Sequence, residues 1–211
     1  DIHTTNSETS NFVDGWFVKT MPDLNHKNMF MATYLIQNSI WWIEYANLSG
    51  FRIDTYPYHD KTFLTEFGKR LIDEYPNFNF VGEEWSLNPA IVSYWQKDSP
   101  RYDHYISYTP SMMDFPLNSV LSKSLLEKEA WNSGLIKIYD VISNDFLYGD
   151  PYNLVVFAGN HDMERIYNQV NEQYPLYEMA MTYVYTTRGI PQVYYGTEIL
   201  LKGPADHGSL R

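Results

Sequence analysis

Cysteine is absent from the 211 residues, which excludes disulfides, thiol nucleophiles and thiolate metal sites. Basic side chains are scarce, because 15 Lys and Arg stand against 26 Asp and Glu, with a formal net charge of −11. A phosphate-binding surface needs clustered Lys and Arg, so this balance argues against nucleic acid as a partner. No apolar run approaches the roughly 18 residues of a membrane span, and the first residues, DIHTTNSETS, do not have the pattern of a signal peptide.

Aromatic residues, by contrast, are abundant. The chain has 6 Trp, 19 Tyr and 11 Phe, and 44% of its residues are hydrophobic against 19% charged, which is the composition of a globular protein. Some of these rings belong in the core because each buries a large area. The others offer flat surfaces on which a ligand can stack.

Short apolar runs alternate with amphipathic stretches along the chain. The patterns predict strands at 50–54, 77–85, 104–108, 152–162 and 189–198, and helices at 31–47, 61–75, 89–96, 118–131 and 176–187. Such alternation predicts βα units around a parallel sheet. Polar residues recur where the predicted strands end, and this is where βα barrels place their active sites.

The first polar cluster is the R-x-D of GFRID, residues 50–54. A period of two places Arg52 and Asp54 on the same side of the strand. A carboxylate beside a guanidinium stays ionised, and it can then act as a nucleophile or as an electrostatic partner of a cation. A structural buried ion pair is the alternative interpretation of this motif.

Two further clusters follow later strands. In VGEEW, alternation predicts that Glu83 and Glu84 face opposite ways, so that only Glu83 shares a cavity with Asp54 and Trp85 lies near it. In AGNHD, residues 158–162, the polar side chains either contribute ligands to a metal site or form a polar turn. Three carboxylates at separate strand ends are what glycoside hydrolysis needs, since one group must be a protonated acid and another an ionised nucleophile.

Five short motifs carry a resemblance to a known family. They are MPDLN at 21–25, GFRIDT at 50–55, VGEEW at 81–85, FAGNHD at 157–162 and GIPQVYYGTE at 189–198. In this order they resemble motifs of the α-amylase family of retaining glycoside hydrolases, and in particular the neopullulanase, cyclomaltodextrinase and maltogenic amylase group. The resemblance implies an α/β fold, a TIM (β/α)8 barrel, of which strands four to eight are present.

The resemblance also implies roles for individual residues. Asp54 would be the nucleophile, Glu83 the general acid/base and Asp162 a third catalytic carboxylate that stabilises the transition state, while the substrate-binding residues would be Arg52, His161, Asn160, Trp85 and Tyr58. For a retaining enzyme we expect the carboxyl groups of Asp54 and Glu83 to lie about 5–5.5 Å apart. Asp162 should approach both, and Arg52 should contact Asp54.

The implied substrate is a starch-type α-glucan: a maltooligosaccharide, a cyclodextrin or pullulan. A transglycosylase or isomerase of the same family uses the same carboxylates, and a non-catalytic carbohydrate-binding module is a further alternative. No cofactor is expected, although structural calcium could bind oxygen ligands around Asn25 or residues 145–150. A bacterial periplasmic or cell-surface location follows from the resemblance alone.

Two departures from the family pattern stand out. Pro57 and Tyr58 occupy the third and fourth positions after the nucleophile, where many members have Lys-His or Asn-Glu. No D-x-x-x-N-H segment of a third barrel strand is found. We therefore expect a partial catalytic barrel over 1–211, with a loop and helix at 1–49 and the strand-four to strand-eight region at 50–211.

A barrel part of this kind exposes an open sheet edge, so it should pair with the remainder of its own chain or with a second copy. Residues 1–211 alone are expected to show little or no hydrolase activity, since catalysis needs the reacting groups held near productive geometry.

Overall fold

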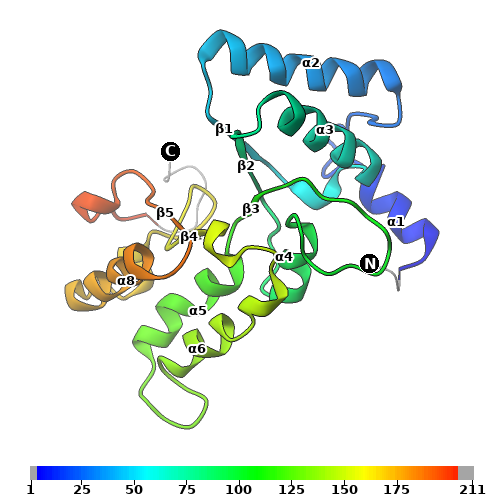
Figure 1. The fold of residues 1–211 in the computed structure, drawn as a ribbon. Helices are drawn as coiled ribbons and strands as arrows, with labels where there is room; N and C mark the ends of the chain where they lie inside the picture. Colours follow the sequence, from blue (N-terminus) through cyan, green and yellow to red (C-terminus); the bar gives the residue numbers. More distant parts are fainter. Residues whose placement is uncertain (1–3, 204–211) are drawn as a thin grey trace.

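The computed structural model describes residues 4–203 and shows an alternation of helices and parallel strands. The helices are α1 (Asn6–Val13), α2 (Met29–Ala46), α3 (Lys61–Glu74), α4 (Pro89–Trp95), α5 (Phe115–Leu126), α6 (Ile136–Ile142), α7 (Ile166–Gln169) and α8 (Tyr174–Thr186). The strands are β1 (Gly50–Ile53), β2 (Asn79–Gly82), β3 (Ser111–Met112), β4 (Val155–Phe157) and β5 (Ile190–Gln192). Figure 1 shows the strands running through the middle of the molecule, with α2 and α3 at one end and α5, α6 and α8 at the other.

The strands are neighbours in the order in which the chain makes them. β1, β2 and β3 form one parallel sheet, and β4 and β5 pair in parallel as a second. A parallel bridge between Met113 and Val155 joins the two sheets, and the amide of Asp114 donates to the carbonyl of Val155 at 2.9 Å. All five carboxyl ends therefore point the same way, which confirms the predicted βα arrangement.

Helix α3 shows how the sequence produces these units. Asp60 caps its first turn by accepting a hydrogen bond from the amide of Phe63 at 3.0 Å. Leu64, Phe67 and Leu71 recur at helical spacing and are buried. Phe67 and Leu71 belong to the same hydrophobic cluster as Ile36 and Ile43 of α2, so the two helices cover the same side of β1 and β2.

Several boundaries differ from the predicted ones. Residues 104–108 are not a strand. His104 has a φ of 62°, which is outside the extended region, and the strand lies further along the chain at β3, Ser111–Met112. Strand β2 ends at Gly82, β4 at Phe157 and β5 at Gln192, so the motif residues that follow them lie in loops. Helices α1, α6 and α7 were not predicted.

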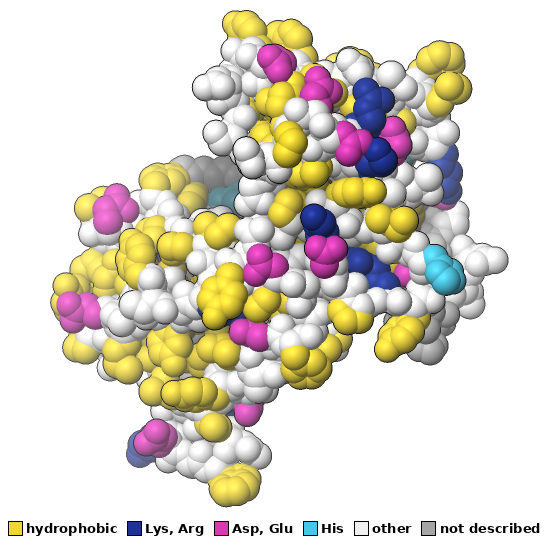
Figure 2. Space-filling view, in the orientation of Figure 1, with side chains coloured by type: hydrophobic (Ala, Val, Ile, Leu, Met, Phe, Trp, Pro, Cys, Tyr) yellow, Lys and Arg dark blue, Asp and Glu magenta, His cyan; other side chains and the backbone are white. Residues whose placement is uncertain are grey.

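One face of α2 is rich in exposed aromatic rings. Phe30, Tyr34, Trp41 and Tyr45 are 80%, 62%, 50% and 73% exposed, and their spacing places them on one side of the helix, opposite the buried Ile36. Figure 2 shows hydrophobic side chains over this end of the molecule and over the α5–α8 end. Among residues 4–203, no helix combines the length and apolarity needed to cross a membrane.

Candidate active site

Arg52, Asp54 and Glu83 meet where β1 and β2 end. Nη1 of Arg52 donates to Oδ1 of Asp54 at 2.8 Å, and Nη2 donates to Oε1 of Glu83. The predicted contact between Arg52 and Asp54 is thus confirmed, and the same guanidinium also binds the second carboxylate. The two carboxylates lie one residue beyond strands whose register pairs Ile53 with Gly82, which explains why they meet.

The two carboxylates have different environments. The side chain of Asp54 is 63% exposed, whereas that of Glu83 is 6% exposed and also accepts a hydrogen bond from the amide of Thr55 at 3.1 Å. Burial raises the pKa of Glu83, while the Thr55 amide and Arg52 oppose that rise and a hydrogen bond with Asp54 adds to it. An exposed carboxylate beside a buried carboxyl with a raised pKa is the arrangement in which one group ionises while the other keeps its proton.

Thr55 adopts an uncommon backbone conformation to make this contact. Its φ of 43° lies in the left-handed region, which few residues other than glycine adopt. In this conformation its amide points at Glu83, and the next amide, of Tyr56, donates to the Glu83 carbonyl at 2.9 Å. The loop after β1 is therefore fastened to the loop after β2 by both main chain and side chain.

The side chain of Glu84 has different hydrogen-bond partners from that of Glu83. Its Oε2 accepts a hydrogen bond from Nε1 of Trp95 in α4 at 3.0 Å. Burial raises the pKa of Glu84 to about 7, which the Trp95 hydrogen bond partly offsets. The sequence predicted that the two glutamates diverge, but it gave no sign that Glu84 would be half-buried in a pocket of its own.

The loop after β4 carries the third predicted cluster. Asn160 is 5% exposed and its Oδ1 accepts from the amide of Asp162 at 2.9 Å. Nε2 of His161 lies 3.0 Å from Oδ2 of Asp162. The segment is thus an ordered polar turn that follows the same end of the strands, and the convergence of Asp162 on Asp54 and Glu83 stays a prediction.

Trp85 and Tyr58 have aromatic partners from other elements. The indole of Trp85 is stacked on the ring of Phe115, with centroids 4.5 Å apart, and 48% of the residue is exposed. The ring of Tyr58 is stacked on Phe12 of α1 at 4.2 Å and meets Phe17 edge-on at 5.4 Å. One face of the Tyr58 ring is therefore covered by protein, and sugar binding by either residue stays a prediction.

Two histidines near Asp54, His59 and His26, were not singled out from the sequence. Nε2 of His59 lies 3.2 Å from the carbonyl of Asp54, and His26 meets His59 edge-on and is stacked on Phe63. Burial lowers the pKa of both histidines, and the proximity of His26 lowers that of His59 further. Both rings are therefore neutral at neutral pH; His59 contacts the main chain of Asp54, and His26 packs against His59.

Arg188, Asp114 and Asp145 form a buried ion cluster that joins the segment before β5, the start of α5 and the turn at Asp145–Leu147. Arg188 binds Oδ2 of Asp114 at 2.5 Å and both oxygens of Asp145, at 2.9 and 2.5 Å. The side chains of Arg188 and Asp114 are only 9% and 0% exposed. The sequence did not reveal this cluster, since its members are 43 and 74 residues apart.

Asn25 and residues 145–150 are the positions where structural calcium could bind. In the part of the chain that the structure describes, no group of three or more His, Asp or Glu side chains is placed to hold a metal ion. Both carboxylate oxygens of Asp145 face Arg188, and the Asn25 side chain accepts from the amide of Lys27 at 3.1 Å. Structural calcium at these positions stays a prediction.

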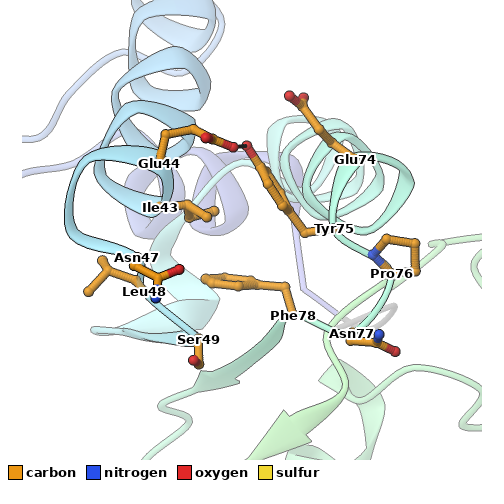
Figure 3. A pocket seen from close by; sticks show the side chains of 10 residues that line it. All are labelled: Ile43, Glu44, Asn47, Leu48, Ser49, Glu74, Tyr75, Pro76, Asn77 and Phe78. Atoms are coloured by element: carbon orange, nitrogen blue, oxygen red, sulfur yellow. Dashed lines mark hydrogen bonds between the residues drawn. The ribbon is translucent and has the colours of Figure 1, made fainter.

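A cavity of about 420 Å³ lies at the other end of the strands from the carboxylates (Figure 3). It lies between the carboxyl ends of α2 and α3, where the hydroxyl of Tyr75 donates to Glu44 at 2.5 Å. Ser49 and Phe78, which precede β1 and β2, line it as well. This position at the amino ends of the strands separates the cavity from the candidate site.

Comparison with known proteins decides the family. The model of the α-amylase catalytic domain matches residues 2–208. The chain belongs to this family. The solved α-amylase from Geobacillus thermoleovorans, complexed with acarbose, has a TM-score of 0.81 and 32% identity, and it covers 99% of this chain. This member of the α-amylase family therefore forms part of a TIM barrel.

Curated relatives are more distant in sequence. A β/α-amylase of Paenibacillus polymyxa is 28% identical over 200 residues, and a cyclomaltodextrin glucanotransferase of Bacillus sp. (strain 38-2) is 27% identical over 187 residues. They cover 92% and 88% of this α-amylase family chain, which spans only 15% and 25% of their length. The chain likewise spans 45% of the solved amylase.

Proposed function

We propose that this chain supplies the catalytic carboxylates of a retaining glycoside hydrolase that cleaves α-glucosidic bonds in starch-type glucans. The single observation that carries the proposal is the bridging of Asp54 and Glu83 by Arg52, with one carboxylate exposed and the other buried. In this proposal the strands correspond to the fourth to eighth strands of the barrel.

Each residue has a defined task in this reaction. Asp54, ionised, attacks the anomeric carbon and forms a glycosyl–enzyme bond while Glu83 donates its proton to the leaving oxygen. Glu83, now ionised, then takes a proton from water, and the water oxygen attacks the same carbon and releases Asp54. Arg52 orients both carboxylates through its two amino groups, and Asp162 would hold sugar hydroxyls as the ring flattens.

Trapping of the covalent intermediate tests the nucleophile. The full-length protein is incubated with 5-fluoro-α-glucosyl fluoride, and peptide mass spectrometry locates the label. We expect a fluoroglucosyl adduct on Asp54 and none in Asp54→Asn. A label on another residue, or product with inverted anomeric configuration by NMR, would contradict the proposal.

The choice between the neighbouring glutamates is tested by kinetics. Glu83→Gln should lower kcat on a maltooligosaccharide by at least about a thousandfold, because the leaving group loses its acid. Glu84→Gln is the matched control and should keep most of the turnover. The reverse result would exchange the two assignments.

Transglycosylation is the second candidate. It is favoured by relatives that are named cyclomaltodextrin glucanotransferases and that match over 88–97% of this chain. It uses the same covalent intermediate and differs only in the acceptor, a sugar hydroxyl instead of water. Chromatography of products from maltoheptaose distinguishes the two: shorter linear sugars indicate hydrolysis, and longer or cyclic sugars indicate transfer.

A further inference from the structure

A pocket of about 490 Å³ lies next to the candidate active site and has no part in the mechanism above. Two of its lining residues follow the candidate carboxylates closely in the chain, since Glu84 is adjacent to Glu83 and Pro57 lies three residues after Asp54. Its volume is in the range of about 300–1,000 Å³ that is typical of small-molecule sites.

The walls of the pocket are mainly apolar and aromatic. Phe12, Ile91, Tyr94, Trp95 and Tyr102 line it, from α1, α4 and the loop that follows α4. Tyr102 is 89% exposed and Ile91 is 48% exposed, so the wall is open to a ligand from solvent.

Most of the charged groups around the pocket are engaged with protein atoms. Arg101 donates to three carbonyls, those of Tyr94, Ser99 and Gln96. Asp103 accepts from Lys61 at 3.0 Å, from the Tyr94 hydroxyl at 2.5 Å and from an amide through its other oxygen. Both side chains are therefore held in place by protein atoms.

Glu84 is different, because only one of its oxygens is used. Oε2 accepts from Trp95 at 3.0 Å, and within residues 4–203 no hydrogen bond is made by Oε1. Since Glu84 lines the pocket, this oxygen is available to a ligand there. Burial keeps its pKa near 7, so the carboxyl can both donate and accept hydrogen bonds around neutral pH.

We propose that this pocket is a second carbohydrate site, which binds one glucosyl unit of an α-glucan with Glu84 hydrogen-bonded to a ring hydroxyl. One face of a glucose ring carries only C–H bonds and can lie on an aromatic ring, and its edge carries hydroxyls that match a carboxyl. The proposal rests on the proposed function, which makes an α-glucan the ligand held next to this pocket.

Site-specific NMR tests this inference. The full-length Asp54→Asn protein is labelled with 5-fluorotryptophan and titrated with maltotriose, and the signals of Trp95 and Trp85 are assigned by Trp→Phe substitution. We expect the Trp95 signal to move and to saturate. Glu84→Leu should weaken the affinity that this signal reports by about tenfold, while the midpoint at Trp85 stays within twofold.

Tyr102→Ala is a second variant, chosen because this exposed side chain contributes little to folding. It should weaken the affinity at Trp95 by about fivefold, and Glu66→Leu, on the exposed surface of α3, should leave it unchanged. A Trp85 signal that moves while Trp95 does not would overturn this inference and leave the proposed function standing. If neither signal moves, this inference also fails, and the labelling of Asp54 decides the proposed function separately. A Trp95 response to choline but not to maltotriose would replace the sugar with an organic cation.

Discussion

At the scale of single residues, one guanidinium holds two carboxylates that would otherwise repel each other. Arg52 comes from within β1, so its direction is fixed by the strand, and its planar fork reaches Asp54 and Glu83 together. An ammonium group is a point charge on a flexible stem and does not reproduce this geometry.

Arg52→Met should therefore lower kcat/KM by about a hundredfold, because both reacting groups lose their orientation. Without the cation the pKa of Glu83 rises further, so the alkaline limb of the pH–rate profile moves to higher pH. Arg70→Met, an exposed arginine on α3, is the control and should leave the profile unchanged. A profile that stays in place in Arg52→Met would show that Arg52 does not act on Glu83.

The raised pKa of Glu84 should make the unfolding free energy of the protein depend on pH. Its pKa is about 7 in the folded state against the usual value of 4.5, so the folded protein holds this proton more tightly than the unfolded chain. The contribution of this proton to the unfolding free energy is complete below about pH 4.5 and is lost as the pH rises to about 7. The loss amounts to about 1–2 kcal/mol after allowing for the partial exposure of Glu84.

Glu84→Gln keeps an acceptor for Trp95 but cannot ionise. Urea unfolding between pH 4.5 and 7.5 should show a smaller loss of unfolding free energy in this variant than in the wild type. Glu66→Gln should behave as the wild type. Parallel curves for the wild type and Glu84→Gln would mean that Glu84 titrates as an exposed group.

At the scale of elements, Gly82 lets the loop after β1 pack against β2 and β3. A Cβ at this position would lie 2.9 Å from Sδ of Met112 and 2.9 Å from the ring of Tyr56. Gly82→Ala should lower the unfolding free energy by about 1–3 kcal/mol, because both neighbours are buried and must shift. In Gly159→Ala, whose Cβ meets nothing closer than 3.7 Å, urea unfolding should show a much smaller loss.

The buried ion cluster links three separate elements: the start of α5, the turn at Asp145–Leu147 and the turn before β5. Arg188→Met leaves Asp114 buried without a cation, which should cost about 3–5 kcal/mol in chemical unfolding. Lys202→Met removes an exposed partner of Glu172 and should cost less than about 1 kcal/mol. Equal losses in the two variants would mean that the cluster is solvated.

The sequence predicted the elements whose pattern is determined locally. Helix α3 has regular apolar spacing, and β4 is a continuous apolar run, buried throughout. Helix α1 was missed because its residues are polar, although the capping box of Thr5 and Glu8 marked its start. Residues 104–108 look like a strand by composition, yet their hydrogen bonds go to Trp95 at the end of α4, to Thr65 of α3 and to the side chain of Asp103, which only the folded chain reveals.

The candidate site was predictable to a similar extent. The R-x-D spacing was sufficient to place Arg52 against Asp54, and the order of motifs indicated Glu83. The sequence could not show that Arg52 also binds Glu83, nor that Arg188 binds Asp114, because contacts between distant residues follow from packing rather than from local pattern.

At the scale of the whole molecule, two surfaces are open to association. Within residues 4–203, β1 has β2 as its only strand neighbour, and the nearby helix α2 presents Trp41 and Tyr45 with their rings stacked at 4.7 Å. Exposed edges and contiguous apolar patches favour association.

A polypeptide of residues 1–211 should therefore form dimers or larger species, measured by size-exclusion chromatography with light scattering. Trp41→Ser with Tyr45→Ser should shift the distribution toward monomer by removing apolar area. Lys69→Ser with Asp73→Ser, an exposed pair on α3, is the control. A wild-type polypeptide that is monomeric throughout would show that neither surface associates.

The strand order has a consequence for synthesis on the ribosome. Because each strand pairs with the next one along the chain, the nascent polypeptide can dock unit by unit, and the Arg52–Glu83 contact spans only 31 residues. The reacting groups can thus come together while the distal half is still being translated. The contact between Asp114 and Arg188 spans 74 residues and must wait. Stalled translation would therefore yield an intermediate in which Arg52 already holds Asp54 and Glu83 while the buried Asp114 still lacks its counter-ion.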